Sequence, residues 1–181
     1  MYKKMAIVGE IGSGKTQLVN TLSEISPFST EVESTVDIGK QYTTVGIDYG
    51  RLSLSDGVVL GLYGLPGQSR YAFLWRMVSE SLWGVIILAK FSAAFQHKDL
   101  ADALRFFDER NSGAPIIIGL THCENAAKKS VAKTIGIINL ILNDQGIAAP
   151  IIPFDTRNPD SAILPLAVFS SIARAEQQGV R

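Results

Sequence analysis

The stretch GEIGSGKT, residues 9–16, decides how this 181-residue chain is interpreted. It follows a short apolar run, precedes a helix-like segment and matches the pattern G-x-x-x-x-G-K-[ST]. Glycines at these positions let successive backbone N–H groups turn toward phosphate oxygens, and the following helix N-terminus adds positive potential. The alternative, an accidental glycine-rich turn, does not explain the strand before the motif or the helix after it. The motif therefore predicts a nucleotide-phosphate loop.

Two side chains of this loop have distinct expected roles. Lys15 would reach the β- and γ-phosphates, and the Thr16 hydroxyl would coordinate Mg²⁺. The residues predicted to contact the nucleotide are Gly9, Glu10, Ile11, Gly12, Ser13, Gly14, Lys15, Thr16 and Gln17.

Short apolar runs alternate with helical patterns along the chain, which predicts an α/β fold with a mainly parallel sheet and helices on both faces. One pair of strands, within residues 43–64, is joined by a tight Ser-Asp-Gly turn and predicts an antiparallel edge. The other strands are expected at residues 4–10, 83–91, 114–122 and 149–155. The length suits a single domain over residues 1–181.

Apolar stripes predict helices over residues 98–110 and 128–143. A last helix is expected from an Asn158 cap to a stop at Gly179. Residues 29–46 are polar and without a clear period, so we interpret them as a loop.

Composition excludes several classes of protein. The net charge is zero, which gives no argument for nucleic-acid binding, and no apolar run is long enough for an integral membrane segment. A single cysteine, Cys123, fits a cytoplasmic protein. Tyr2 stands where myristoylation needs glycine, so we expect no lipid anchor, although partners could recruit the chain to a membrane.

Two later segments offer groups that could sense a γ-phosphate. Thr43 and Thr44 precede a strand, and Thr44 lies in the context T-x-G-x-D; an ordinary pair of β-favouring residues is the alternative interpretation. Asp48 is more typical of a surface strand residue than of a metal ligand, and contact with the metal region is the alternative. In GLPGQSR, residues 64–70, Gly67 offers a backbone N–H to the γ-phosphate and Gln68 could orient the attacking water. We therefore predict Lys15, Thr44 and Gln68 as catalytic residues and Thr16 and Thr44 as metal ligands.

These motifs, taken in order, resemble those of Ras-like small GTPases. The chain is more closely similar to the predicted prokaryotic GTPases related to the gliding-motility and cell-polarity GTPases, over roughly residues 3–175. The resemblance implies a P-loop NTPase fold like that of small GTPases, with a mostly parallel six-stranded sheet, one antiparallel edge strand and helices on both faces. It also implies that the chain binds GTP or GDP with Mg²⁺.

The chain departs from the Ras-like pattern at three positions. Gly64 stands where Ras-like proteins carry the Asp that helps to hold Mg²⁺, although the polarity GTPases and their relatives commonly lack it too. Ile11 replaces a frequent glycine and should crowd the γ-phosphate and the catalytic glutamine. Thr43 stands where the polarity GTPases carry an intrinsic arginine. We therefore expect weaker metal dependence and slow hydrolysis.

The base-recognition motif of the family, N/T-K-x-D, is matched by THCE, residues 121–124. A carboxylate there accepts the N1–H and 2-amino group of guanine, which adenine lacks. The residues expected at the base are Thr121, His122 and Glu124, together with Asp155, Thr156 and Arg157 in the place of the S-A-K motif. A plain polar loop is the alternative interpretation of both stretches.

The favoured function is a guanine-nucleotide switch whose GTP and GDP states are read by partner proteins. The family resemblance implies a roadblock-type regulator, acting as a GTPase-activating protein or an exchange factor, and a role in bacterial polarity, motility or surface signalling. A scaffold that binds nucleotide with negligible hydrolysis is the alternative. A P-loop kinase or ATPase is a third, weakened because we find no arginine-rich lid segment.

Overall fold

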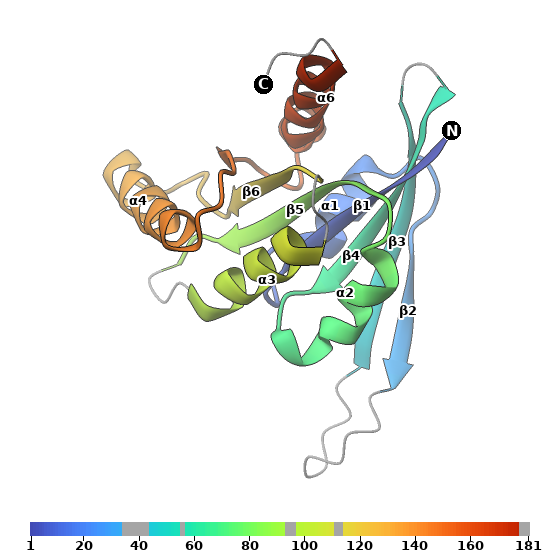
Figure 1. Cartoon of the computed structure of the whole chain (residues 1–181), viewed down its shortest axis with the longest axis horizontal. Coiled ribbons are helices and arrows are strands. Elements are labelled where there is room, and N and C mark those ends of the chain that lie inside the picture. The colour runs from blue at the N-terminus through green and yellow to red at the C-terminus, as the bar shows by residue number, and fades with distance from the viewer. Residues whose placement is uncertain (34–43, 55–56, 93–96, 111–113, 178–181) are drawn as a thin grey trace.

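A seven-stranded sheet runs through the molecule in the spatial order β2-β3-β4-β1-β5-β6-β7 (Figure 1). The computed structural model describes residues 1–33, 44–54, 57–92, 97–110 and 114–177. The strands are β1 (Tyr2–Gly9), β2 (Phe28–Glu33), β3 (Thr44–Ser53), β4 (Val59–Pro66), β5 (Leu82–Lys90), β6 (Ile116–Thr121) and β7 (Ile151–Pro153). β3 pairs antiparallel with both β2 and β4, whereas the other neighbouring strands pair in parallel.

The predicted α/β fold is confirmed, but the sheet has one strand more than expected. The additional strand is β2, which begins just before the segment interpreted as a loop and pairs with residues 44–49 of β3. Its sequence alternates the β-favouring Phe28, Thr30 and Val32 with polar residues, which suits an edge strand. The rest of the expected loop, residues 34–43, lies outside the described residues, as do Ser55 and Asp56 of the expected turn.

The helices connect the strands across both faces of the sheet. They are α1 (Lys15–Leu22), α2 (Ala72–Val78), α3 (His97–Arg110), α4 (Lys128–Gln145), α5 (Pro159–Ala162) and α6 (Leu164–Gln177), and a short 3-10 helix, η2 (Ser69–Tyr71), precedes α2. The helices predicted over residues 98–110 and 128–143 are confirmed as α3 and α4. No helix in the described part of the chain combines the length and the apolar character that crossing a membrane requires.

The last predicted helix is divided into two. The Asn158 cap is confirmed, because its Oδ1 accepts from the backbone N–H groups of Asp160 and Ser161. The division follows from Pro165, which has no N–H to continue the helical hydrogen-bond ladder. The expected stop at Gly179 lies outside the described residues.

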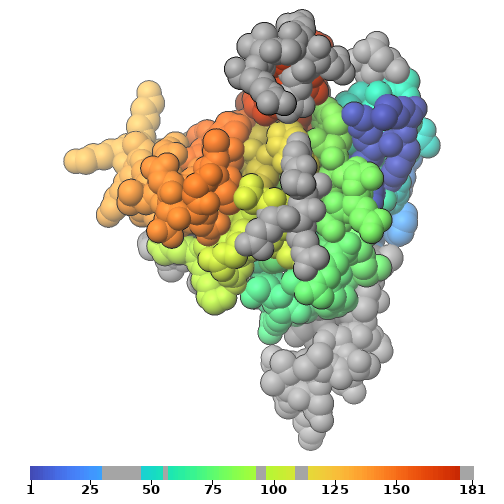
Figure 2. Space-filling view, viewed as in Figure 1, coloured from blue at the N-terminus to red at the C-terminus, as the bar shows by residue number. Residues whose placement is uncertain are grey.

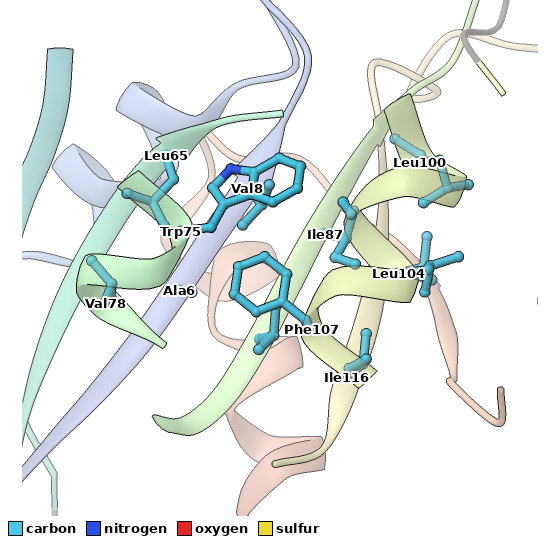
Figure 3. Close-up of a cluster of buried hydrophobic side chains, with 14 of the residues drawn as sticks. Ala6, Val8, Leu65, Trp75, Val78, Ile87, Leu100, Leu104, Phe107 and Ile116 are labelled. Carbon is cyan, nitrogen blue, oxygen red and sulfur yellow. The ribbon is translucent and has the colours of Figure 1, made fainter. Parts of the chain in front are cut away.

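Two apolar clusters hold the helices to the sheet. On the side that faces the viewer in Figure 2, helices α2, α3 and α4 pack against β1, β4, β5 and β6. There Trp75 of α2 and Phe107 of α3 meet over β1 (Figure 3). The other side packs α1, α5 and α6 against the same strands. Both clusters consist mainly of buried aliphatic and aromatic side chains, and fully burying a large one contributes about 1.5–3 kcal/mol.

The parallel strands determine where a site can form. β1, β4, β5, β6 and β7 all point the same way, so the loops that follow them meet at one edge of the sheet. In open α/β sheets ligands bind outside these carboxyl ends. The predicted phosphate loop, the turn at Gly67 and both predicted base-binding loops follow such strands.

Candidate nucleotide-binding site

The loop from Gly9 to Thr16 joins β1 to α1 in the predicted strand-loop-helix arrangement. Gly12 and Gly14 have φ values of 74° and 97°, which a residue with a side chain rarely adopts. In the described part of the chain no side chain caps α1, and its first turn has no acidic residue. The N–H groups and the positive potential at this helix end are therefore available to an anion.

The Lys15 ammonium group lies across the phosphate loop. Its Nζ donates to the Glu10 carbonyl oxygen at 2.8 Å, so the side chain folds back over the turn. Burial lowers the pKa of Lys15, and the nearby carboxylates of Asp48 and Glu10 partly offset that effect. A desolvated cation beside unpaired helical N–H groups makes this loop a place where a phosphate would be stabilised.

Three other loop residues differ in how they are placed. Ser13 is fully buried, whereas the side chain of Ile11 is 73% exposed and points away from the protein. Gln17 donates to the Thr21 hydroxyl along the surface of α1, so its side chain does not face the loop. Ile11 is thus placed to meet a ligand or a partner from outside.

Asp48 is not the surface residue that the sequence indicates. It is 8% exposed, and its Oδ2 accepts a hydrogen bond of 2.6 Å from the Thr16 hydroxyl. Its Oδ1 accepts from the Ser29 hydroxyl of β2. The structure therefore brings a carboxylate to the side chain predicted to bind Mg²⁺, from a strand 32 residues further along the chain.

The register of the sheet explains this position. Asp48 of β3 lies directly opposite Gly64 of β4, the position where the expected Asp is missing. A Cβ at Gly64 would lie 3.0 Å from both the Cβ and the Oδ2 of Asp48. The glycine thus leaves room for a carboxylate supplied by the neighbouring strand. The sequence predicts this antiparallel pair of strands, and the tight turn that joins them is the signal from which the position of Asp48 opposite Gly64 could have been inferred.

The turn after β4 is joined to the phosphate loop. The Gly67 N–H donates to the Gly9 carbonyl oxygen at 2.8 Å, so it is committed to the protein rather than presented to a phosphate. A Cβ at Gly67 would lie 2.5 Å from the Gly9 carbonyl carbon, so only glycine fits. The Trp75 indole N–H donates to the Pro66 carbonyl oxygen at 2.7 Å and fixes the other side of the turn.

The structure gives fewer contacts for the other two predicted catalytic residues, Gln68 and Thr44. Gln68 precedes η2, and its buried Oε1 makes no hydrogen bond with the described residues. Thr44 begins β3 opposite Glu33, while Thr43 lies outside the described residues.

Thr121 connects the predicted base loop to the phosphate loop. It is 1% exposed, and its hydroxyl donates to the Ser13 carbonyl oxygen at 2.9 Å. His122 Nδ1 lies 3.0 Å from the same hydroxyl oxygen. Since the single hydroxyl hydrogen is used by Ser13, Nδ1 is the donor, and the opposite ring nitrogen remains available. His122 adopts a left-handed φ of 61° and its side chain is exposed at the site.

The loop after β7 lies beside the loop after β6. Arg157 contacts both Asp155 and Glu124, and hydrogen bonds from Arg157 hold the pKa of Asp155 below its usual range. The Asp155 N–H donates to Ser161 and the Arg157 N–H to Asp155, so among the described residues only the Thr156 N–H of these three lacks an acceptor. Thr156 is buried against Gly14 of the phosphate loop.

No family model and no curated protein matches this chain, but solved structures do. The small GTPase Arl6 of Trypanosoma brucei, solved with the nucleotide analogue GppNp, matches with a TM-score of 0.69 and 14% identity over 96% of this chain and 98% of its own. The G domain of the FeoB iron transporter of T. maritima matches with a TM-score of 0.62 and 18% identity over 96% and 99%.

The elongation factor SelB of Methanococcus maripaludis, solved with the GTP analogue GppNHp, matches with a TM-score of 0.67 and 18% identity over 97% of this chain. The chain spans about a third of the SelB chain, 34%. At such identities the likeness is one of fold. The chain therefore has the P-loop fold of small-GTPase G domains, and its own residues must supply the argument for function.

Proposed function

We propose that this protein is a guanine-nucleotide-binding switch with slow GTP hydrolysis. The observation that carries the proposal is the contact between Thr16 and Asp48 at the uncapped N-terminus of α1. This contact supports the proposal because a carboxylate beside Thr16 could orient a metal ion at the phosphate loop, although the family position for that carboxylate holds Gly64.

The residues around the phosphate loop fit a Mg²⁺-bound triphosphate. The left-handed Gly12 and Gly14 shape a cradle of N–H groups, and Lys15 adds one charge. Mg²⁺ prefers oxygen ligands and retains several waters, so the Thr16 hydroxyl would bind it directly while Asp48 would accept from its waters. Following the family resemblance, Thr44 would be the second protein ligand of the metal. When bound, Mg²⁺ supplies positive charge that neutralises the phosphate oxygens.

The base loops fit guanine. The Glu124 carboxylate can accept from two adjacent N–H groups, which guanine has and adenine lacks. The free N–H of Thr156 can donate to a carbonyl oxygen of the base. His122 offers a flat ring beside them, as a stacking surface. Adenine would leave both Glu124 and Thr156 without a matching partner, which costs affinity.

The switch would consist of an exchange of hydrogen bonds at Gly67. Its N–H donates to Gly9, and a γ-phosphate would compete for the same N–H. The turn would then move and carry Gln68 with it. The buried Oε1 of Gln68 has to become accessible before this side chain can orient water, which supports slow turnover without a regulator.

The proposal includes partner proteins that read this turn. Phe73 and Met77 follow it on α2, one helical turn apart, and are 50% and 69% exposed. A surface that moves with the turn and carries apolar side chains suits a state-dependent partner. Following the family resemblance, we propose a roadblock-type regulator and a role in bacterial polarity, motility or surface signalling.

A comparison of nucleotides tests the proposal. Purified protein should bind GDP and GTP in preference to ADP and ATP, and Mg²⁺ should tighten binding. Lys15→Ala should abolish binding of all four, because it removes the charge at the phosphates. Equal affinity for ATP and GTP would refute the guanine assignment, and absence of binding would refute the whole proposal.

A nucleotide-binding scaffold with negligible hydrolysis is the second candidate. The buried Oε1 of Gln68 and the exposed Ile11 at the mouth of the loop favour it. Single-turnover measurements separate the two. A switch should hydrolyse bound GTP faster when a regulator is added, and Gln68→Leu should slow that reaction while binding stays intact.

A further inference from the structure

The site contains an arginine that the family motifs do not require. Arg157 Nε donates to Asp155 Oδ1 and Nη2 to Asp155 Oδ2, both at 2.9 Å, in a two-pronged pair. The same Nη2 lies 3.7 Å from Glu124 Oε1. One guanidinium group therefore connects a carboxylate after β6 with a carboxylate after β7.

We propose that Arg157 is a positioning residue that sets guanine specificity by holding the Glu124 carboxylate in place. The proposal rests on the proposed function, because it concerns the base that this site selects. Arg157 need not touch the nucleotide, since it would act through Glu124.

The length of the Glu124 side chain favours this role for Arg157. Glutamate has one more rotatable bond than the aspartate usual at this position, so it loses more side-chain freedom when it is fixed on a base. A neighbouring charge that already restricts the carboxylate reduces that loss on binding. Arg157 is suited to this because the pair with Asp155 fixes its own guanidinium plane.

The distance between Arg157 and Glu124 suits positioning rather than competition with the base. At 3.7 Å the Arg157–Glu124 contact is longer than a hydrogen bond, so it attracts the carboxylate without occupying its lone pairs. Both Glu124 oxygens thus stay able to accept from the N1–H and the 2-amino group of guanine. A closer pair would compete with the base, and a more distant one would not orient the carboxylate.

The geometry of these contacts requires arginine. Lysine carries a single ammonium group and cannot make the two-pronged contact with Asp155 while also reaching Glu124. Arg157→Lys should therefore restore only part of the effect of Arg157. Asp155→Asn should resemble Arg157→Ala, because it releases the guanidinium group.

The experiment measures dissociation constants of GDP, IDP and ADP for the full chain by calorimetry. IDP lacks the 2-amino group, so the ratio of the dissociation constants for IDP and GDP reports how well the Glu124 carboxylate is positioned to accept from that group. Arg157→Ala should weaken GDP binding about tenfold, IDP less, and leave ADP unchanged. Arg174→Ala, a change at an exposed arginine of α6, is the matched control and should alter none of them.

A double-mutant cycle separates positioning from general electrostatics. In a Glu124→Gln background, Arg157→Ala should have no further effect on the ratio of the dissociation constants for IDP and GDP. An equal loss for GDP and ADP, or an unchanged GDP affinity, would overturn the inference while leaving the proposed function intact. If the unaltered protein does not prefer GDP to ADP, the proposed function itself fails.

Discussion

The contact between Asp48 and Thr16 leads to a quantitative prediction for Asp48→Asn. Asparagine keeps the shape of the side chain, and its Oδ1 can still accept from the Thr16 hydroxyl. Its NH2 group would then face Ser29, whose hydroxyl can turn to accept from it, so the substitution removes the charge and keeps both hydrogen-bonded contacts. We expect GDP binding in the absence of Mg²⁺ to remain, and the strengthening of binding by Mg²⁺ to be lost. The reason is that Asp48 would orient the waters of a metal held by Thr16.

The size of the effect follows from the geometry. With Thr16 Oγ1 2.6 Å from Asp48 Oδ2 and a Mg²⁺–oxygen distance of about 2.1 Å, the carboxylate oxygen lies within about 4.7 Å of the ion. A single and a double charge at that separation attract by about 1.8 kcal/mol with the full screening of water, and by about 7 kcal/mol at the effective dielectric constant of a protein surface. The lower value is already about 20-fold in affinity for Mg²⁺.

The assay titrates Mg²⁺ into the complex with a fluorescent GDP analogue, and the dissociation rate of the analogue is measured at each Mg²⁺ concentration. The Mg²⁺ concentration at which half of the slowing of dissociation is reached should rise at least about 20-fold in Asp48→Asn. Ser29→Ala, which removes the other hydrogen-bond partner of Asp48 but keeps the charge, should change it much less. An unchanged Mg²⁺ titration in Asp48→Asn would refute the reasoning.

Two variants test whether the carboxylate near Thr16 can be supplied by β4 instead of β3. Gly64→Asp alone should destabilise the fold by about 1–3 kcal/mol, because its Cβ would meet Asp48 at 3.0 Å. Adding Asp48→Gly should relieve the overlap and return a carboxylate from β4, so Mg²⁺ dependence should be regained in the double variant. Continued loss of Mg²⁺ dependence there would mean that a carboxylate on β4 cannot replace Asp48.

Three further predictions concern the phosphate loop and the turn beside it. Burial lowers the pKa of Lys15 in the folded protein, so at pH values between that lowered pKa and 10.5 the unfolded chain binds more protons than the folded one. The free energy of unfolding should therefore rise with pH in this range. Urea unfolding of the nucleotide-free protein should show this rise, and Lys15→Met should lack it. Gly67→Ala should separate the turn from Gly9, lower stability by about 1–3 kcal/mol and raise the hydrogen-exchange rate of the turn; unaltered exchange would count against the contact. Trp75→Phe should cost more than about 1 kcal/mol in thermal unfolding, because it removes the hydrogen bond to Pro66 and part of a buried ring; an unchanged melting temperature would contradict both contributions.

Much of the fold could be predicted because its signals are local. The helical stripes of α3 and α4 and the Asn158 cap lie within single segments, and each reflects hydrogen bonds and packing over a few residues. The sequence did not predict β2, because an edge strand needs only a weak alternation of apolar and polar residues and is stabilised by its pairing with β3. The division at Pro165 was missed although proline gave a signal, because the apolar pattern continues across it.

The sequence by itself determined the phosphate loop. Its glycines, lysine and threonine are contiguous, and the turn they form depends on backbone conformations that only glycine adopts freely. Three contacts were decided by the tertiary structure alone. They are the hydrogen bond from Thr16 to Asp48, the hydrogen bond from the Gly67 N–H to Gly9, and the contact of Arg157 with Glu124 in the neighbouring loop. These contacts depend on the register and order of strands that are distant along the chain, and a difference of one residue in the register of β3 would turn Asp48 to the opposite face of the sheet.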